Sequence, residues 1–301
     1  MSKQKIKKYF FGIALIVVLI IIANFLQTVS EIVIAENNSD KSSDNLVNIN
    51  NLREQVLPSD GVIIPVIWGS LGLDMIKTGV IDSPKFEGLY ERGGGLSEYS
   101  KNLLYSGDNK EIKITKENSR VLLNLLWAFG LSNKNEILEN GPMTDDKYGG
   151  DPSQFASTGG WSISVGSPME HYSKHSFVLL TEEQQKRVKN VAKGIYRPCC
   201  GNSTYFPDCN HGMAMLGLLQ LLAVQGLSEE EMFDIALSVN SYWFPETYLT
   251  IATYFEKQGV SWEEVDPKMV LGVDYSSSSG YRRILEKVVP VESQSGGDCG
   301  V

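Results

Sequence analysis

The chain has 301 residues, of which 42% are apolar and 21% are charged, a balance typical of a globular protein and not of a disordered or collagen-like one. Its 36 acidic residues outnumber its 27 basic residues, and the net charge of −9 makes it a poor candidate for nucleic-acid binding. Four cysteines are too few for a dense disulfide scaffold, so a hydrophobic core must hold the fold.

The N-terminus predicts the cellular compartment. Four lysines lie within residues 1–8, which we expect to form a basic cytoplasmic tail. The apolar run over 9–26 would be about 27 Å long as a helix, which is enough to cross a membrane. It predicts an uncleaved single-pass anchor, with the rest of the chain extracytoplasmic. The alternative is a signal peptide, because Val33 and Ala35 form a pattern that a signal peptidase could accept. Cleavage after Ala35 would give a secreted protein.

The exported part is expected to begin with a polar linker. Residues 27–60 include a long stretch rich in Asn, Ser and Asp that has no apolar periodicity. A folded domain should then cover residues 61–290, followed by a glycine-rich tail over 291–301. Strand signals within the domain are confined to short pieces, such as 62–68 and 111–115.

Helix start signals recur through the rest of the domain. Helices are expected after Ser83, after Ser97 and after Thr115, the last of these opening the apolar segment Val121–Gly130. Glycines and prolines over 140–170 predict a long loop, and loops of that length are often functional. Three further helices are predicted at 182–195, 209–225 and 229–244. The first and third begin with capping boxes at Thr181 and Ser228, and the second is expected to be capped by Asp208 and ended by Gly226.

The residues whose side chains are most capable of catalysis or metal binding lie just before and at the start of the second of these helices. Cys209 is predicted at its first turn, where free backbone N–H groups and the helix dipole stabilise a thiolate. Arg197 could stabilise that thiolate further. We therefore expect Cys209 to be the reactive thiol, with Cys199 or Cys200 as its resolving partner.

Three interpretations of this segment stay open. In the first, Cys209 pairs with Cys199 or Cys200 in a structural disulfide, which would add roughly 2–3 kcal/mol of stability. In the second, the thiols carry out thiol–disulfide exchange, since three clustered thiols leave one unpaired. In the third, the cysteines and His211 bind a metal: a Cys3His set suits zinc, whereas soft sulfur with imidazole suits copper(I).

Other residues could contribute to a centre of this kind. His171 and His175 are four apart, so on a helix they would share a face that could hold a metal. Cys299 lies in the flexible glycine-rich tail, from which it could contact the cysteine cluster and pass electrons or a metal to it. Met213 and Met215 are expected to fill the core. The sequence contains no G-x-S-x-G, P-loop, H-E-x-x-H or dinucleotide-binding motif.

Residues 182–244 also carry a resemblance to a known family. They contain a helix, a loop of the form R-x-C-C-G-N-S…D-x-N, a second helix, and the start G-x-S-E-E-E of a third. This arrangement resembles the thiol-bearing three-helix module of the periplasmic subunit that prepares apocytochrome c for haem ligation. The resemblance implies a membrane-anchored extracytoplasmic thiol reductant, and only Cys199 or Cys200 corresponds to its C-x-x-C pair. Cys209 and His211 are additions.

The sequence therefore predicts a mainly α protein, in which a single-pass N-terminal membrane helix precedes a helical extracytoplasmic domain with a long Gly-rich loop. Its expected function is thiol redox exchange by Cys209, Cys199 and Cys200, or the handling of zinc or copper(I) by these residues and His211. Its expected partners are the membrane and a thiol protein, and not nucleic acid. The alternative is a non-enzymatic envelope binding or scaffold protein with a structural disulfide.

Overall fold

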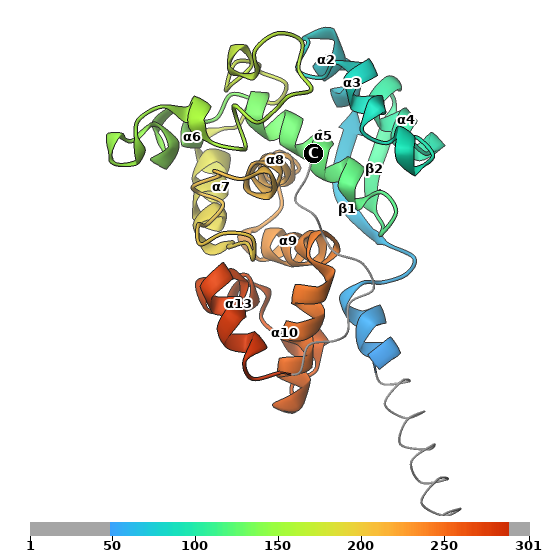
Figure 1. Cartoon of the computed structure of the whole chain (residues 1–301), viewed down its shortest axis with the longest axis vertical. Coiled ribbons are helices and arrows are strands. Elements are labelled where there is room, and N and C mark those ends of the chain that lie inside the picture. The colour runs from blue at the N-terminus through green and yellow to red at the C-terminus, as the bar shows by residue number, and fades with distance from the viewer. Residues whose placement is uncertain (1–48, 289–301) are drawn as a thin grey trace, which may run out of the picture. The chain divides into compact units, whose positions relative to one another are not determined.

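The computed structural model describes residues 49–288 and contains one pair of antiparallel strands among these residues (Figure 1). β1 (Val62–Gly69) pairs with β2 (Asn109–Ile114), and the register is irregular between Ile64 and Ile67. Ile64 is buried and Ile67 is exposed, because a strand directs its side chains to two faces. Both strands lie where the sequence predicts them, to within two residues.

Helices form most of the remaining described chain, which confirms the mainly α prediction. The elements named here belong to one compact unit that begins at Leu52. In chain order the helices are α2 (Leu71–Lys77), α3 (Ser83–Gly88), α4 (Glu98–Tyr105), α5 (Ser119–Ser132), α6 (Glu136–Asn140), α7 (Glu182–Gly194), α8 (Asn210–Val224), α9 (Glu229–Trp243), α10 (Pro245–Lys257), α11 (Pro267–Val270), α12 (Val273–Ser276) and α13 (Ser278–Leu285).

No helix within residues 49–288 is both long and apolar enough to cross a membrane. The anchor predicted over 9–26, the basic tail over 1–8 and the tail over 291–301 with Cys299 all lie outside the described residues.

Helix α8 is the centre of the helical core. Figure 1 shows it surrounded by α5, α7 and α9, and each of these three helices contacts it. Every residue from His211 to Ala223 is buried, as expected for a helix that is apolar on all faces. The α5–α8 approach depends on glycine: a Cβ on Gly130 would collide with the Met213 carbonyl oxygen, and a Cβ on Gly217 would collide with α5. Met213 and Met215 fill the core, as predicted.

Most helix ends follow the predicted signals. The capping boxes at Thr181 and Ser228 are both present, and Gly226 adopts the left-handed backbone that ends α8, with φ of 87°. The predicted cap of α5 is wrong. Thr115 and Asn118 instead hydrogen bond to each other in the preceding turn, and the helix begins after Asn118.

The Gly-rich segment is a succession of short turns packed on the core. It contains no α-helix or strand between α6 and α7, in agreement with the predicted loop. Two tryptophan side chains hydrogen bond the segment to the rest of the fold. Trp127 donates to the Ser157 carbonyl oxygen, and the fully buried Trp161 donates to the Val80 carbonyl oxygen. The 3-10 turns of the segment are η2 (Pro142–Thr144), η3 (Asp146–Tyr148), η4 (Pro152–Gln154) and η5 (Pro168–Glu170).

The polar linker expected over 27–60 does not extend to residue 60. Leu52 and Val56 lie in a helical stretch and are buried in the core. The Tyr242 hydroxyl group donates to the Pro58 carbonyl oxygen at 2.6 Å, so the chain is attached to α9 before β1 begins. Apolar spacing of four residues, Leu52 to Val56, buries one face of this stretch despite its polar neighbours.

Candidate functional site

The loop that carries Cys199 and Cys200 connects α7 to α8 and is held by backbone hydrogen bonds. Within the loop, Thr204 N–H donates to the Ile195 carbonyl oxygen at 2.8 Å. At its edge, Tyr196 N–H donates to Leu271, and Ser278 N–H donates to the Cys200 carbonyl oxygen at 3.0 Å. The two cysteines therefore extend from a backbone that is fixed by the C-terminal helices.

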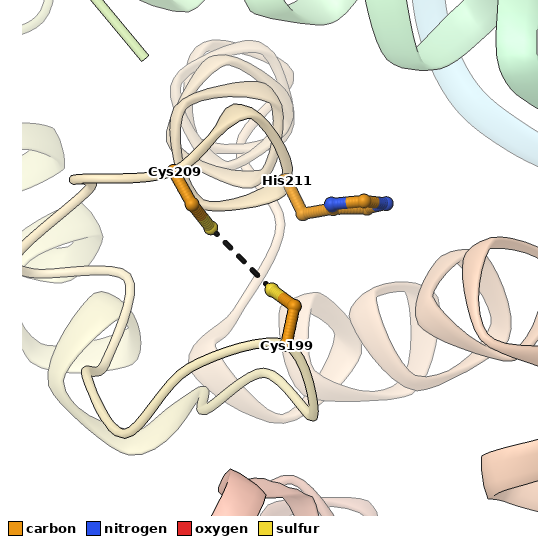
Figure 2. A group of neighbouring side chains, drawn as sticks. All are labelled: Cys199, Cys209 and His211. Atoms are coloured by element: carbon orange, nitrogen blue, oxygen red, sulfur yellow. Dashed lines mark hydrogen bonds between the residues drawn. The ribbon is translucent and has the colours of Figure 1, made fainter. Parts of the chain in front are cut away.

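The sulfur atoms of Cys199 and Cys209 face each other across a distance of 3.6 Å (Figure 2). A disulfide bond would be about 2.05 Å long, so the two residues are reduced here and not joined to each other. Cys199 is exposed, whereas Cys209 is half-buried at the start of α8. Cys200 contacts the Asn202 carbonyl oxygen at 4.0 Å, and its sulfur lies within 4.8 Å of that of Cys209. The structure thus brings the three predicted cysteines together around Cys209.

Arg197 provides the positive charge of the site from a fully buried position. Its Nε donates to Cys209 Sγ at 3.2 Å, and its Nη2 donates to the Phe206 carbonyl oxygen and to Asp208 Oδ1 at 2.9 Å. The guanidinium group lies against Gly212, where any Cβ would collide with it. Because a hydrogen-bonded cation favours the anionic form of sulfur, this contact stabilises a thiolate on Cys209.

The two facing thiols differ strongly in acidity. Hydrogen bonds from Cys199 and Cys200, together with the charge of Arg197, lower the pKa of Cys209 well below its usual value, while burial acts in the opposite direction. Hydrogen bonding with Cys200 and with Cys209 raises the pKa of Cys199. The negative charge therefore resides on Cys209 and the proton on Cys199. This agrees with the expectation that Cys209 is the thiolate.

Asp208 does not cap α8, contrary to the prediction. Its two carboxylate oxygens accept hydrogen bonds from Arg197 and from Asn202 Nδ2, the latter at 2.8 Å. Cys209 takes the N-cap position and makes no side-chain capping bond. Burial raises the pKa of Asp208, and the charge of Arg197 opposes that shift. The prediction missed this pairing, although Arg197 and Asp208 stand with opposite charges on the two sides of Cys199 and Cys200 in the sequence.

His211 lies beside the sulfur atoms, but its ring packs on aromatic side chains. The ring centroid is 4.4 Å from that of Phe244 and 5.9 Å from that of Trp243. Figure 2 shows the ring extending to one side of the line between the two sulfurs. Burial lowers the pKa of His211 to about 4, so the imidazole is neutral near pH 7. It adds no positive charge to the thiols, and a neutral ring nitrogen keeps a lone pair that can bind a metal.

The potential metal ligands form two overlapping groups of three. Cys199, Cys209 and His211 make one group, and Cys200, Asp208 and Cys209 make the other, with ligand atoms within 4.8 Å of one another in each. The 3.6 Å between the facing sulfurs is close to the roughly 3.8 Å of two sulfurs on one tetrahedral zinc. The cluster could therefore hold a metal ion. The predicted Cys3His set is not gathered as one group, because Cys200 falls in the group with Asp208 and Cys209 and not in the group with His211.

His171 and His175 form a separate pair outside any helix. Their Nδ1 and Nε2 atoms are 3.1 Å apart, and His171 Nε2 lies 3.0 Å from the Val165 carbonyl oxygen. Since the carbonyl can only accept, Nε2 of His171 must donate to it, and in a neutral ring the Nδ1 atom then accepts from Nε2 of His175. Both nitrogens of His171 are thus engaged, and the helical face that the sequence predicted for a metal is absent.

Comparisons with known proteins add no further assignment. No protein-family model matches the chain, and neither does any curated protein or any solved structure. The helix, cysteine loop, helix and third helix expected over 182–244 are present as α7, α8 and α9. The resemblance of this segment to the haem-ligation module itself stays a prediction.

Proposed function

We propose that this chain is a membrane-anchored extracytoplasmic protein that carries out thiol–disulfide exchange through Cys199 and Cys209. The observation that carries the proposal is the contact of a fully buried guanidinium group with Cys209 Sγ at 3.2 Å, opposite an exposed thiol at 3.6 Å. Exchange requires one thiolate and one neighbouring sulfur within reach, and this pair supplies both.

Cys199 is the better candidate for the resolving thiol. Its sulfur is 3.6 Å from that of Cys209 and its side chain is exposed, whereas Cys200 is half-buried and its sulfur also contacts the Asn202 carbonyl oxygen at 4.0 Å. Cys200 lies close enough to Cys209 to compete once the loop moves, so the two adjacent cysteines need a direct comparison.

The test is to equilibrate the full chain in detergent with glutathione at several ratios of oxidised to reduced form. Acid trapping, alkylation and peptide mapping then identify the disulfide. We expect a Cys199–Cys209 linkage that forms and breaks reversibly, survives in Cys200→Ser and is lost in Cys209→Ser. Cys200→Ser is a matched control, because it removes one thiol of the same loop. Absence of a linkage at every ratio would reject the proposal.

A soft-metal centre is the second candidate function, supported by the grouping of Cys199, Cys209 and the neutral His211. These residues would offer two sulfurs and one imidazole nitrogen, which suit zinc with a further ligand or three-coordinate copper(I). The measurement is elemental analysis of protein purified without chelator, with wild type, Cys209→Ser and Cys200→Ser compared. One equivalent of metal that depends on Cys209 would favour this function, and metal-free protein would remove it.

The anchored location rests on the basic residues 1–8 and the apolar run over 9–26. We expect the chain to sediment with membranes and its domain to be digested by protease added to the outer face of intact cells. Release into the medium would instead favour cleavage after Ala35. Protection from the protease would place the domain on the cytoplasmic side of the membrane and contradict the proposed location.

A further inference from the structure

The two facing sulfurs differ in what surrounds them. Cys209 contacts a guanidinium group that cannot readily move, because Arg197 has no exposed surface and is bonded to Phe206 and Asp208. Cys199 has no cation within hydrogen-bond distance among the described residues, and its side chain is exposed. The surroundings of Cys209 therefore stabilise a negative charge on its sulfur, whereas the sulfur of Cys199 is the one that a substrate can reach.

Oxidation would leave the guanidinium group without an anionic partner on its Nε edge. In the thiol form, Nε donates to Cys209 Sγ, while Nη1 is buried and has no hydrogen-bond partner within residues 49–288. A disulfide sulfur is neutral and a poor acceptor, so the buried Nε–H of Arg197 would then lose its strong acceptor, beside an Nη1 group that has none in the reduced form either. A buried donor without an acceptor is costly. The dithiol form of the pair is therefore favoured over the disulfide form.

From these asymmetries we infer that the Cys199–Cys209 disulfide is an oxidant of dithiol proteins or peptides, with Cys199 the sulfur that is attacked and Cys209 the sulfur that leaves. This inference rests on the exchange function proposed above, and it names the substrate class and the direction of electron flow. It runs opposite to the reductant role implied by the sequence resemblance.

The step balances as a two-electron exchange. A substrate thiolate attacks Cys199 Sγ, the Cys199–Cys209 bond breaks, and Cys209 leaves as a thiolate beside Arg197. The second substrate thiol then loses its proton and attacks the substrate sulfur of the mixed disulfide, which releases Cys199, and Cys199 takes up a proton. The substrate dithiol has become a disulfide, and the protein has gained two electrons. A stabilised leaving group makes the first step faster, and a stabilised reduced form makes the overall exchange favourable.

Two substitutions should move the equilibrium in opposite directions. Arg197→Gln removes the cation beside Cys209, so the disulfide should become at least tenfold more favoured in glutathione buffer at pH 7, which corresponds to about 30 mV. Asp208→Asn removes the anion that partly neutralises Arg197, so the disulfide should become severalfold less favoured. Arg283→Gln, which breaks an exposed ion pair with Asp274, is the matched control and should leave the ratio unchanged.

The experiment uses the full chain in detergent, with circular dichroism to confirm that each variant is folded. If Arg197→Gln does not fold, the direction in which Asp208→Asn changes the ratio of disulfide to dithiol still tests the inference. A disulfide that forms but does not respond to either substitution, or responds to both in the same direction, overturns the oxidant inference and leaves exchange standing. Failure of any Cys199–Cys209 disulfide to form overturns both.

A second measurement identifies the attacked sulfur. Oxidised wild-type protein is mixed with a synthetic peptide containing one cysteine and quenched with acid within seconds, and the mixed disulfide is mapped. We expect the peptide on Cys199. A peptide found on Cys209 would reverse the assignment. With a two-cysteine peptide, stoichiometric oxidation should be slowed at least tenfold by Arg197→Gln and unaffected by Arg283→Gln.

Discussion

At the scale of single residues, the acidity of Cys209 can be measured directly. In reduced, metal-free protein at pH 6.5 we expect iodoacetamide to modify Cys209 faster than Cys199, although Cys199 is the more exposed thiol. Alkylation requires the thiolate, and the hydrogen bonds and charge around Cys209 lower its pKa. Quantitative peptide mapping gives both rates in one sample. Faster modification of Cys199 would contradict the distribution of charge described here.

His211 makes stability depend on pH. Its pKa is about 4 in the folded protein because of burial, and about 6.5 in an unfolded chain, so the unfolded state binds the additional proton between these values. Stability should therefore fall as the pH falls through this window, by about 2 kcal/mol between pH 7 and pH 5.

The control for this prediction is His211→Phe, which keeps a ring against Phe244 but cannot bind a proton. Urea unfolding of reduced, chelator-treated protein at pH 7 and pH 5 gives the two free energies. The loss measured for wild type should exceed that of the variant by the stated amount. Equal losses would show that His211 does not titrate in this range.

At the scale of secondary-structure elements, the α5–α8 contact predicts the sensitivity of the core. Gly217→Ala places a Cβ against the backbone of α5, so we expect a loss of about 1–3 kcal/mol in the free energy of unfolding. Gly88→Ala in α3 is the matched control, because no atom lies near its Cβ position. That variant should be neutral or slightly more stable. Equal effects of both substitutions would contradict the close helix approach.

The elements were the most predictable part of this protein. Apolar periodicity and capping residues are local signals, and they gave α7, α8 and α9 with bounds correct to within one residue. Helix α10 was missed, although Pro245 stands at its first turn. The cysteine cluster was predicted as a group because its members are close in the sequence.

The partners within the site were harder to predict. Asp208 looked like a helix cap, because a cap and a buried ion pair both place an acid before a helix. Its pairing with Arg197 depends on how the loop folds back. The packing of His211 on Phe244 joins α8 to the junction between α9 and α10 and has no local signal. Contacts of this kind depend on the tertiary fold, which a single sequence does not display.

At the scale of the whole molecule, the oxidation state should change stability in a direction that separates two interpretations. A structural Cys199–Cys209 disulfide would stabilise the fold by roughly 3 kcal/mol, because it closes a ten-residue loop in the unfolded chain. An oxidising disulfide is less stable in the folded protein than in the unfolded chain, so the reduced protein should be the more stable form.

Thermal unfolding of the oxidised and reduced full chain measures this difference, with Cys209→Ser as a control that should not respond to the reductant. A higher Tm in the reduced form supports the oxidant. A higher Tm in the oxidised form favours the scaffold protein with a structural disulfide.

The hydrogen bonds that join Leu271 and Ser278 to the cysteine loop, one accepted by the Leu271 carbonyl oxygen and one donated by Ser278 N–H, determine when the centre is completed during biosynthesis. A nascent polypeptide that has emerged as far as residue 260 already contains Cys199, Cys200 and Cys209, but not the backbone that orders them. At that stage the three cysteines are in an unfolded segment and can form non-native disulfides. We therefore expect the Cys199–Cys209 pair to form selectively only after the C-terminal helices have docked. Truncation before residue 271 should abolish this selectivity, although every cysteine of the loop is still present.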